Sequence, residues 1–378
     1  MDRLTVMTII GTRPEIIRLS ECIKACDRHF NHILCHTGQN WDYELNEIFF
    51  RDLGLRKPDH FLNCAGKDLG ETMGNVIARS YELLAQVKPD ALLILGDTNS
   101  ALCAISAKRL KIPIFHMEAG NRCFDQNVPE EVNRKIVDHT SDINLPYTEH
   151  ARRNLLAEGL PPQYIFVTGS PMREVLTKNQ DAIKASRVLQ EHGLVPGQYM
   201  VLSAHREENV DHIDNFTSLM TAVNAVAEQY QLPIIFSTHP RSRKRIQERG
   251  FALHPLLRSL PPFGFHDYVH LQKNALCVLS DSGTLSEESA MLNFPAVLIR
   301  TSTERPEAID KGTAIVGGIA ATSILQAIAI ATTQQRIGCA TNAINDYRQE
   351  NVSDTVVRIV QGYVPIVNNR IWMKQSGN

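Results

Sequence analysis

Residues 4–15 read LTVMTIIGTRPE, and this stretch decides the fold. The apolar run Leu4–Ile10 has the length and the β-branched content of a buried strand in a parallel sheet. Thr12 and Glu15 have the spacing of a capping box, which predicts the start of a helix. The helical pattern continues through Ile16–Cys26. A strand that passes through a short turn into a helix is the opening of a Rossmann-like unit.

The same alternation of short apolar runs and amphipathic stretches continues along the chain. In the first half the predicted strands are Leu4–Ile10, Ile33–Thr37, Ala91–Leu95, Ile112–Met117, Ile143–Pro146 and Ile165–Thr168. In the second half they are Met200–Ala204, Ile234–Ser237, Tyr268–Leu271, Leu276–Ser280, Ala296–Arg300 and Ala314–Gly317. Strands of this length that alternate with helices predict parallel sheets covered on both faces.

A chain of 378 residues exceeds the size at which one hydrophobic core stops growing. We therefore expect an α/β protein of two Rossmann-like domains with a cleft between them. The first is predicted over residues 1–170 and the second over 171–350, with a C-terminal helical segment over 351–378. Ligands bind such sheets at the carboxyl ends of the strands.

The composition excludes several classes of protein. The net charge of −2 lacks the basic excess of a nucleic-acid-binding protein. The eight cysteines include no C-x-x-C pair, which favours buried thiols over a disulfide or zinc framework. The fourteen histidines include no H-E-x-x-H motif, so no metal is expected. No signal peptide and no membrane span are predicted, and we expect a cytoplasmic protein.

Acidic residues follow the predicted strands of the first half. Asp97 follows Ala91–Leu95 and Glu118 follows Ile112–Met117, while Glu130 and Glu131 begin the next helix after Pro129. Each carboxylate alone is more readily explained as a helix cap or a surface charge. Together, Asp97, Glu118 and one of the Glu pair are predicted to meet at one sheet edge, where grouped carboxylates raise one another's pKa and suit acid–base chemistry.

Phosphate-binding features occur in both halves. Arg13 follows the first strand at a predicted helix start, beside free amides that favour an anion. The segment GTRPE lacks the G-x-G-x-x-G fingerprint of dinucleotide-binding proteins, so NAD is not expected. In the second half, the pair His205-Arg206 ends a strand. Ser282, Gly283 and Thr284 form a small turn into a helix whose amides are predicted to cradle phosphate, and Glu288, one turn later, can reach a ribose.

Taken together, these segments resemble the UDP-N-acetylglucosamine 2-epimerase family, in family order from residue 1 to about 320. The segments that carry the resemblance are Gly11–Glu15, Gly96–Thr98, Glu118–Gly120, Pro129–Arg134, His205-Arg206, Asp281–Glu288 and Thr303–Glu307. The resemblance implies a glycosyltransferase-B-like fold, a homodimer, a UDP-sugar substrate and no cofactor. It also implies an isomerase that removes and re-adds UDP.

The resemblance also implies roles for individual residues. Those implied to be catalytic are Asp97, Glu118, Glu130 and His205. Those implied to bind substrate are Arg13, Gln39, Arg206, Ser282, Gly283, Thr284, Glu288 and Arg305. Gln39 lies in His36–Gln39, which is similar to a family segment near the sugar but more loosely. Arg305 lies in Thr303–Glu307, which alone reads as a loop.

Some positions depart from the usual family pattern. Gly96–Ser100 stands where a threonine run is usual, Asn121 stands in a segment that usually reads Gly-Leu-Arg-Thr, and Glu207 replaces a second Arg. With Gly264–Tyr268, these variants resemble the branch that forms UDP-N-acetyl-L-fucosamine from the 6-deoxy-L-talose sugar for capsule or O-antigen synthesis. The alternatives are UDP-N-acetylglucosamine to UDP-N-acetylmannosamine epimerisation, a glycosyltransferase of the same fold, and a non-catalytic UDP-sugar sensor.

Overall fold

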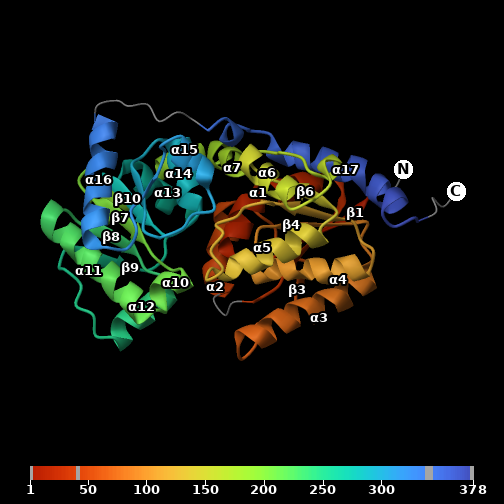
Figure 1. Ribbon diagram of the computed structural model, residues 1–378, viewed down its shortest axis with the longest axis horizontal. Coiled ribbons are helices and arrows are strands. Elements are labelled where there is room, and N and C mark those ends of the chain that lie inside the picture. The colour runs from red at the N-terminus through yellow and green to blue at the C-terminus, as the bar shows by residue number, and fades with distance from the viewer. Residues whose placement is uncertain (1–2, 40–42, 337–343, 375–378) are drawn as a thin grey trace. The chain divides into compact units, whose positions relative to one another are not determined.

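The computed structural model describes residues 3–39, 43–336 and 344–374, and the statements below concern these residues. The chain divides into two compact units (Figure 1). Unit 1 consists of Met1–Lys178 together with Arg348–Asn378, and unit 2 consists of Asn179–Tyr347. The chain therefore leaves unit 1 once and returns to it for its last helix.

Unit 1 contains a six-stranded parallel sheet. Its strands are β1 (Thr5–Ile10), β2 (Asn31–His36), β3 (His60–Phe61), β4 (Ala91–Leu95), β5 (Ile114–Met117) and β6 (Ile143–Leu145). They lie in the order β3-β2-β1-β4-β5-β6. The order reverses direction between β1 and β4, which is the point where Rossmann-like sheets open a crevice for ligands.

Helices cover both faces of this sheet. They are α1 (Arg13–His29), α2 (Tyr43–Asp52), α3 (Leu69–Val87), α4 (Cys103–Arg109), α5 (Pro129–Thr140), α6 (Glu149–Ala157), α7 (Met172–Lys178) and α17 (Val352–Arg370), with short 3-10 turns η1 (Asn99–Leu102) and η2 (Pro162–Tyr164). Helices α7 and α17 pack against α1, whereas α3, α4 and α5 pack together on the opposite side of the sheet (Figure 1).

Unit 2 repeats this architecture. Its strands are β7 (Met200–Ser203), β8 (Ile234–Ser237), β9 (Leu257–Leu260), β10 (Cys277–Ser280), β11 (Ala296–Leu298) and β12 (Ile315–Val316). All are parallel and lie in the order β12-β11-β10-β7-β8-β9. Counted from β7, this is the same order as in unit 1, so the corresponding reversal lies between β7 and β10.

The sheet of unit 2 separates two hydrophobic cores. Its helices are α8 (Gln180–Ala185), α9 (Val188–Glu191), α10 (Glu207–Val210), α11 (Ile213–Tyr230), α12 (Pro240–Glu248), α13 (Phe265–Asn274), α14 (Thr284–Leu292), α15 (Pro306–Asp310) and α16 (Ala321–Arg336), with the 3-10 turn η3 (Asn345–Tyr347). Leu202 packs into the core under α11 and α16, while its neighbour Val201 packs into the core with α9 and α13. Successive strand residues face opposite sides, so both must be apolar.

The two sheets confirm the predicted α/β class with two Rossmann-like units. Some predicted elements were wrong. Tyr268–Leu271 is not a strand and lies inside α13, and Ile165–Thr168 contributes only an isolated bridge from Ile165 to Asn144. The edge strands β3 and β9 were not predicted, because neither has the apolar run that marks a buried strand.

Seven cysteines lie in the part of the chain that the structure describes, all as free thiols, and all but Cys123 are buried. Cys339 lies outside the described residues. Within that same part of the chain, no helix is both long and apolar enough to cross a bilayer. The described residues also contain no group of three or more His, Cys, Asp or Glu side chains that could hold a metal ion.

Candidate functional site

Glu118 is held by a buried arginine at the carboxyl end of β5. Its carboxylate forms an ion pair with Arg18 of α1, and both side chains are almost inaccessible to water. The side-chain amide of Asn121 donates to the other carboxylate oxygen at 3.3 Å. The Glu118 backbone has a φ of +66°, a left-handed conformation that is strained for a residue other than glycine. Backbone strain of this kind concentrates at functional sites. The partner of Glu118, Arg18, was not predicted from the sequence pattern.

Asp97 lies at the carboxyl end of β4 and is also paired with an arginine. Arg134 of α5 approaches Asp97 Oδ2 through Nε and Nη2, each at 2.8 Å. Asn133, the preceding residue, donates to the backbone carbonyl of Asp97 at 2.9 Å. The pairing keeps a partly accessible carboxylate in a fixed orientation, which is a requirement for a group that moves protons.

The structure distinguishes the two glutamates that begin α5. Glu131 is fully buried and accepts hydrogen bonds from the Cys123 and Phe124 amides and from Arg134. Burial opposes ionisation of Glu131, but these hydrogen bonds outweigh it and lower its pKa. Glu130 is partly accessible. Glu131 thus stabilises the loop that contains Cys123 and Phe124. Glu130 is the member of the pair that is accessible to a ligand.

A buried glutamate, Glu15, bridges the reversal point of unit 1. Thr12 is the N-cap of α1 as the capping box predicts, but only half of the box forms, because the Thr12 side chain accepts no helix amide and its Oγ1 instead donates to Glu15 Oε2 at 2.8 Å. Glu15 also accepts the Gly11 amide at 3.0 Å and the hydroxyl of Ser100, which follows β4. Burial raises the pKa of Glu15 to about 7, against the lowering effect of Ser100, Thr12 and Gly11. The sequence pattern assigned Glu15 to the helix cap and did not predict its burial or its contact with Ser100.

Arg13 and Gln39 lie at the ends of neighbouring strands. Arg13 is the first residue of α1 and is partly accessible. Gln39 follows β2, and a Cβ atom placed on Gly11 would lie 3.2 Å from Gln39 Cδ and 2.2 Å from Thr37 Oγ1. Only a glycine at position 11 lets these side chains approach the end of β1. Both predicted residues therefore lie near the edge that carries Asp97 and Glu118.

In unit 2, Asp281 organises the reversal point between β7 and β10. It is fully buried and accepts the backbone amides of His205 and Arg206 and the side-chain amide of Asn209. His205 Nδ1 lies 3.1 Å from Asp281 Oδ1, and its side chain remains 40% exposed. Burial alone would raise the pKa of Asp281, but the His205 and Arg206 interactions lower it to about 2. Asp281 thereby fixes the two residues predicted to face a phosphate.

The predicted phosphate cradle lies at the amino-terminal end of α14. Gly283 has the N-cap position and Thr284 is the first helical residue. The Ser282 amide donates to Ser280 Oγ at 3.1 Å and the Thr284 amide donates to Ser282 Oγ at 3.3 Å. These hydroxyls satisfy two of the three amides expected to bind an anion, so an anion would have to compete with them.

Glu304 fills the space beside Gly283. Its carboxylate accepts from Arg206 Nη2 at 3.3 Å and from Arg300 Nη1 at 2.8 Å. A Cβ atom placed on Gly283 would lie only 2.2 Å from Glu304 Oε1. Arg206 is thus oriented by a carboxylate at the cradle, an interaction that no sequence pattern revealed.

Two other predicted substrate-binding residues are buried. Glu288 accepts a hydrogen bond from Gln272 Nε2 at 2.6 Å. Arg305 is 1% exposed and forms an ion pair with Glu287 at 2.7 Å. The role of Arg305 in substrate binding stays a prediction.

Gly283→Ala is expected to weaken binding of UDP at least about tenfold, which corresponds to ~1.4 kcal/mol. The added methyl group would displace Glu304 and with it Arg206. Calorimetric titration with UDP measures the effect. Gly74→Ala in α3 is the control, since nothing lies within 4 Å of its Cβ position and UDP binding should not change. Unchanged affinity in G283A would show that this turn does not contact the nucleotide.

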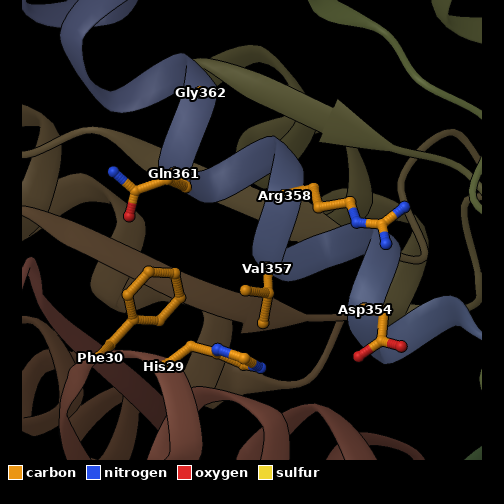
Figure 2. A pocket seen from close by; sticks show the side chains of 7 residues that line it. All are labelled: His29, Phe30, Asp354, Val357, Arg358, Gln361 and Gly362. Atoms are coloured by element: carbon orange, nitrogen blue, oxygen red, sulfur yellow. The ribbon is translucent and has the colours of Figure 1, made fainter.

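A groove of about 580 Å³ lies in unit 1, and none of its lining residues is a predicted site residue. Figure 2 shows its lining at the end of α1 and along α17, which includes His29, Phe30, Asp354, Val357, Arg358 and Gln361. Helix α1 has 17 residues, so its two ends are separated by roughly 25 Å at about 1.5 Å per residue. Arg13 begins α1 and His29 ends it, and the groove is therefore not part of the predicted site.

Both units thus carry polar side chains at the carboxyl ends of a doubly wound parallel sheet, as in enzymes of the α/β class. A family model described as UDP-N-acetylglucosamine 2-epimerase matches residues 24–361. The chain therefore belongs to the UDP-N-acetylglucosamine 2-epimerase family, and the predicted isomerase class is confirmed.

Individual relatives agree with this membership. The UDP-N-acetylglucosamine 2-epimerase of Methanocaldococcus jannaschii is 34% identical over 93% of this chain and 97% of its own. The UDP-2,3-diacetamido-2,3-dideoxy-D-glucuronate 2-epimerase of Pseudomonas aeruginosa is 33% identical over 85% of this chain and 91% of its own. The structure of UDP-N-acetylglucosamine 2-epimerase from Rickettsia bellii has a TM-score of 0.91 and 48% identity, covering 98% of this chain and 100% of that one. The glycosyltransferase-B-like fold predicted for the two units is that of these structures.

Proposed function

We propose that this protein epimerises C2 of a UDP-sugar by eliminating and re-adding UDP. We further propose that its preferred substrate pair is UDP-2-acetamido-2,6-dideoxy-L-talose and UDP-N-acetyl-L-fucosamine. The observation that carries the proposal is the pair of arginine-bound carboxylates, Glu118 with Arg18 and Asp97 with Arg134, at neighbouring strand ends. A solved relative from M. jannaschii is described as a complex with UDP-N-acetylglucosamine and UDP, which supports a UDP-sugar as substrate.

The chemistry requires more than one proton carrier. The C2 proton of an acetamido sugar is weakly acidic, so deprotonation alone is unattractive. Proton removal from C2 with departure of UDP from C1 breaks the C–H and C–O bonds together and leaves a neutral glycal. Addition of UDP to C1 with a proton delivered to the opposite face of C2 inverts that carbon. Two faces need two proton carriers, and a set of carboxylates supplies them.

We propose that Asp97 or Glu118 removes the proton and that Glu130 acts on the other face. Each of the first two is held in one orientation by its arginine, and Glu130 is the accessible member of its pair. We further propose Arg13 and Gln39 as contacts of the sugar and its phosphates.

The departing UDP gains negative charge, which must be stabilised. We propose that His205, Arg206 and the amides of Ser282–Thr284 supply this stabilisation, that Glu288 binds the ribose, and that Arg305 contributes to substrate binding. A preorganised donor at a developing charge is typically worth ~3 kcal/mol of barrier.

The choice of the L-fucosamine branch rests on the variant positions. Asn121 stands in a segment that usually reads Gly-Leu-Arg-Thr, and its amide contacts the proposed base Glu118. Ser100, at the end of another variant segment, donates to Glu15. Both variants thus contact carboxylates of the candidate site. The UDP-N-acetylglucosamine/UDP-N-acetylmannosamine pair is the alternative, since the relatives named for UDP-N-acetylglucosamine fit the fold equally.

The test incubates the purified protein with each UDP-sugar alone in D₂O. We expect a second UDP-sugar with deuterium at C2, and kcat/KM for the L-talo sugar at least about tenfold above that for UDP-N-acetylglucosamine. A preference for UDP-N-acetylglucosamine would reject the branch and keep the 2-epimerase. Release of UDP only with an added acceptor would indicate a glycosyltransferase, and binding without turnover would indicate a sensor.

We also propose that the enzyme acts as a cytoplasmic homodimer that supplies sugar for capsule or O-antigen synthesis. Sedimentation of the purified protein at several concentrations tests the dimer.

A further inference from the structure

We propose that Asp138 and His116 are positioning residues that keep the loops of Glu118 and Asp97 at a fixed spacing. Both side chains are buried, and neither was predicted from the sequence as a site residue. Their role rests on the proposed function, because it concerns the two carboxylates that are proposed to remove the C2 proton. All the contacts involved lie within unit 1.

Asp138 of α5 holds the loop that follows Glu118. Its two carboxylate oxygens lie 3.2 and 3.1 Å from the Gly120 amide, and Oδ2 also forms an ion pair with Arg122 Nη1 at 2.7 Å. Arg122 Nη1 in turn donates to the backbone carbonyl of Asn121 at 2.7 Å. One buried carboxylate therefore fixes this loop at successive residues.

The same loop is also held by α6. Gly120 has a φ of +82°, and a Cβ atom placed on it would lie 2.3 Å from the backbone oxygen of Ala151. Asn154 Nδ2 donates to the Gly120 carbonyl at 2.9 Å. Glu118, in the same loop, has a left-handed backbone with a φ of +66°. A strained conformation persists only where the surrounding contacts over-determine it, and the contacts of Gly120 with α5 and α6 supply that constraint.

His116 connects Asp138 to the loop of Asp97. Its Nδ1 lies 3.0 Å from Asp138 Oδ1, and its Nε2 lies 2.8 Å from the backbone oxygen of Gly96. Gly96 directly precedes Asp97, and a Cβ atom placed on Gly96 would lie 3.6 Å from Glu118 Oε2. The two loops therefore approach each other closely, and the His116–Asp138 pair contacts both of them.

Proton transfer is sensitive to the spacing that this pair maintains. Displacement of a reacting group by about 1 Å can cost about 10²-fold in rate. Arginines orient the carboxylates of Glu118 and Asp97, whereas the His116–Asp138 pair fixes the backbone from which those side chains extend. A shift of that backbone should slow the chemical step and leave the UDP contacts proposed in unit 2 unaffected.

The test compares Asp138→Asn with the wild type as full-length proteins. Asparagine has one acceptor oxygen where aspartate has two, so it cannot hold both Gly120 and Arg122 as Asp138 does. We expect kcat per folded enzyme to fall about 10- to 10²-fold with KM little changed. With a UDP-sugar deuterated at C2, the kinetic isotope effect on kcat should be at least as large as in the wild type, because proton transfer has become slower.

Asp142→Asn is the matched control. Asp142 is also a buried aspartate of unit 1 that accepts a backbone amide, that of Ile114 at 2.9 Å, and it pairs with Lys108 at 2.6 Å. Ile114 begins β5, whereas Glu118 follows the carboxyl end of that strand. D142N should therefore lower Tm but leave kcat and the isotope effect unchanged.

If D138N does not fold, Asn154→Ala decides, because it removes a partly accessible side chain that holds the same Gly120. It should lower kcat by a smaller factor with KM little changed, and wild-type kcat would overturn the positioning role. The role is also overturned by wild-type kcat in folded D138N, by equal losses of kcat in D138N and D142N, or by a loss with a smaller isotope effect. A wild-type protein that epimerises neither UDP-sugar would instead reject the proposed function itself.

Discussion

Glu118→Gln is expected to lower kcat by about 10² to 10⁴ while UDP still binds. The substitution keeps the shape of the side chain but removes the capacity to take the C2 proton that we propose for it. Turnover of the UDP-sugar and incorporation of deuterium at C2 should fall together, because both need the same proton transfer. NMR spectra recorded at successive times in D₂O measure turnover of the UDP-sugar and deuterium incorporation at C2 in the same sample.

The same substitution removes the Glu118 charge from beside the buried Arg18 cation, which is expected to cost about 3–5 kcal/mol of stability. The double variant Arg18→Gln with Glu118→Gln removes both charges of this ion pair. It should recover much of the stability but none of the activity, which separates folding from chemistry. Normal turnover in a folded E118Q protein would remove Glu118 from the mechanism.

Asp281→Asn is expected to destabilise unit 2 and to weaken UDP binding. The carboxylate accepts hydrogen bonds from the backbone amides of His205 and Arg206, and an amide side chain cannot accept all of them or balance the nearby positive charge. The Asp281 pKa is lowered from 3.8 to about 2, which corresponds to about 2 kcal/mol of stability. Because the folded pKa is depressed, this contribution is complete above pH ~4 and is lost as the pH falls towards ~2.

Thermal unfolding of the wild type and of D281N across about pH 2–7 measures the effect. The difference in Tm between wild type and D281N should be largest near neutral pH and should shrink below pH ~4. Asp181→Asn is the control in the same unit, since that side chain is 93% exposed and its substitution should change little. A difference in Tm that does not vary with pH would mean that the Asp281 charge is not what stabilises the loop.

The pattern of apolar residues in the sequence predicted the central strands well. Ala91–Leu95 and Ile234–Ser237 have the bounds expected from sequence, because a strand buried on both faces must be apolar at every position. Tyr268–Leu271 shows the limit of that pattern. Its β-branched and aromatic residues fit a strand, yet it packs as part of α13, where burial against the core outweighs local preference.

For the candidate site, chain order alone predicted which loops would lie at the carboxyl ends of the strands. Asp97 and Glu118 follow strands of unit 1 and His205 follows a strand of unit 2, and the parallel strands of each sheet bring their carboxyl ends to one edge of that sheet. The partners of these residues could not be read from the sequence. Arg18 lies 100 residues from Glu118, and Glu304 lies 98 residues from Arg206.

The sequence by itself therefore determined the α/β class, the two Rossmann-like units and the loops at their strand ends, because hydrophobic period and turn residues act over short distances along the chain. The folded structure was needed to show which arginine holds which carboxylate, and that Glu15 is fully buried with a pKa near 7. Ion pairing, burial and hydrogen bonding depend on distances in space, and the folding of separate segments onto one sheet sets those distances.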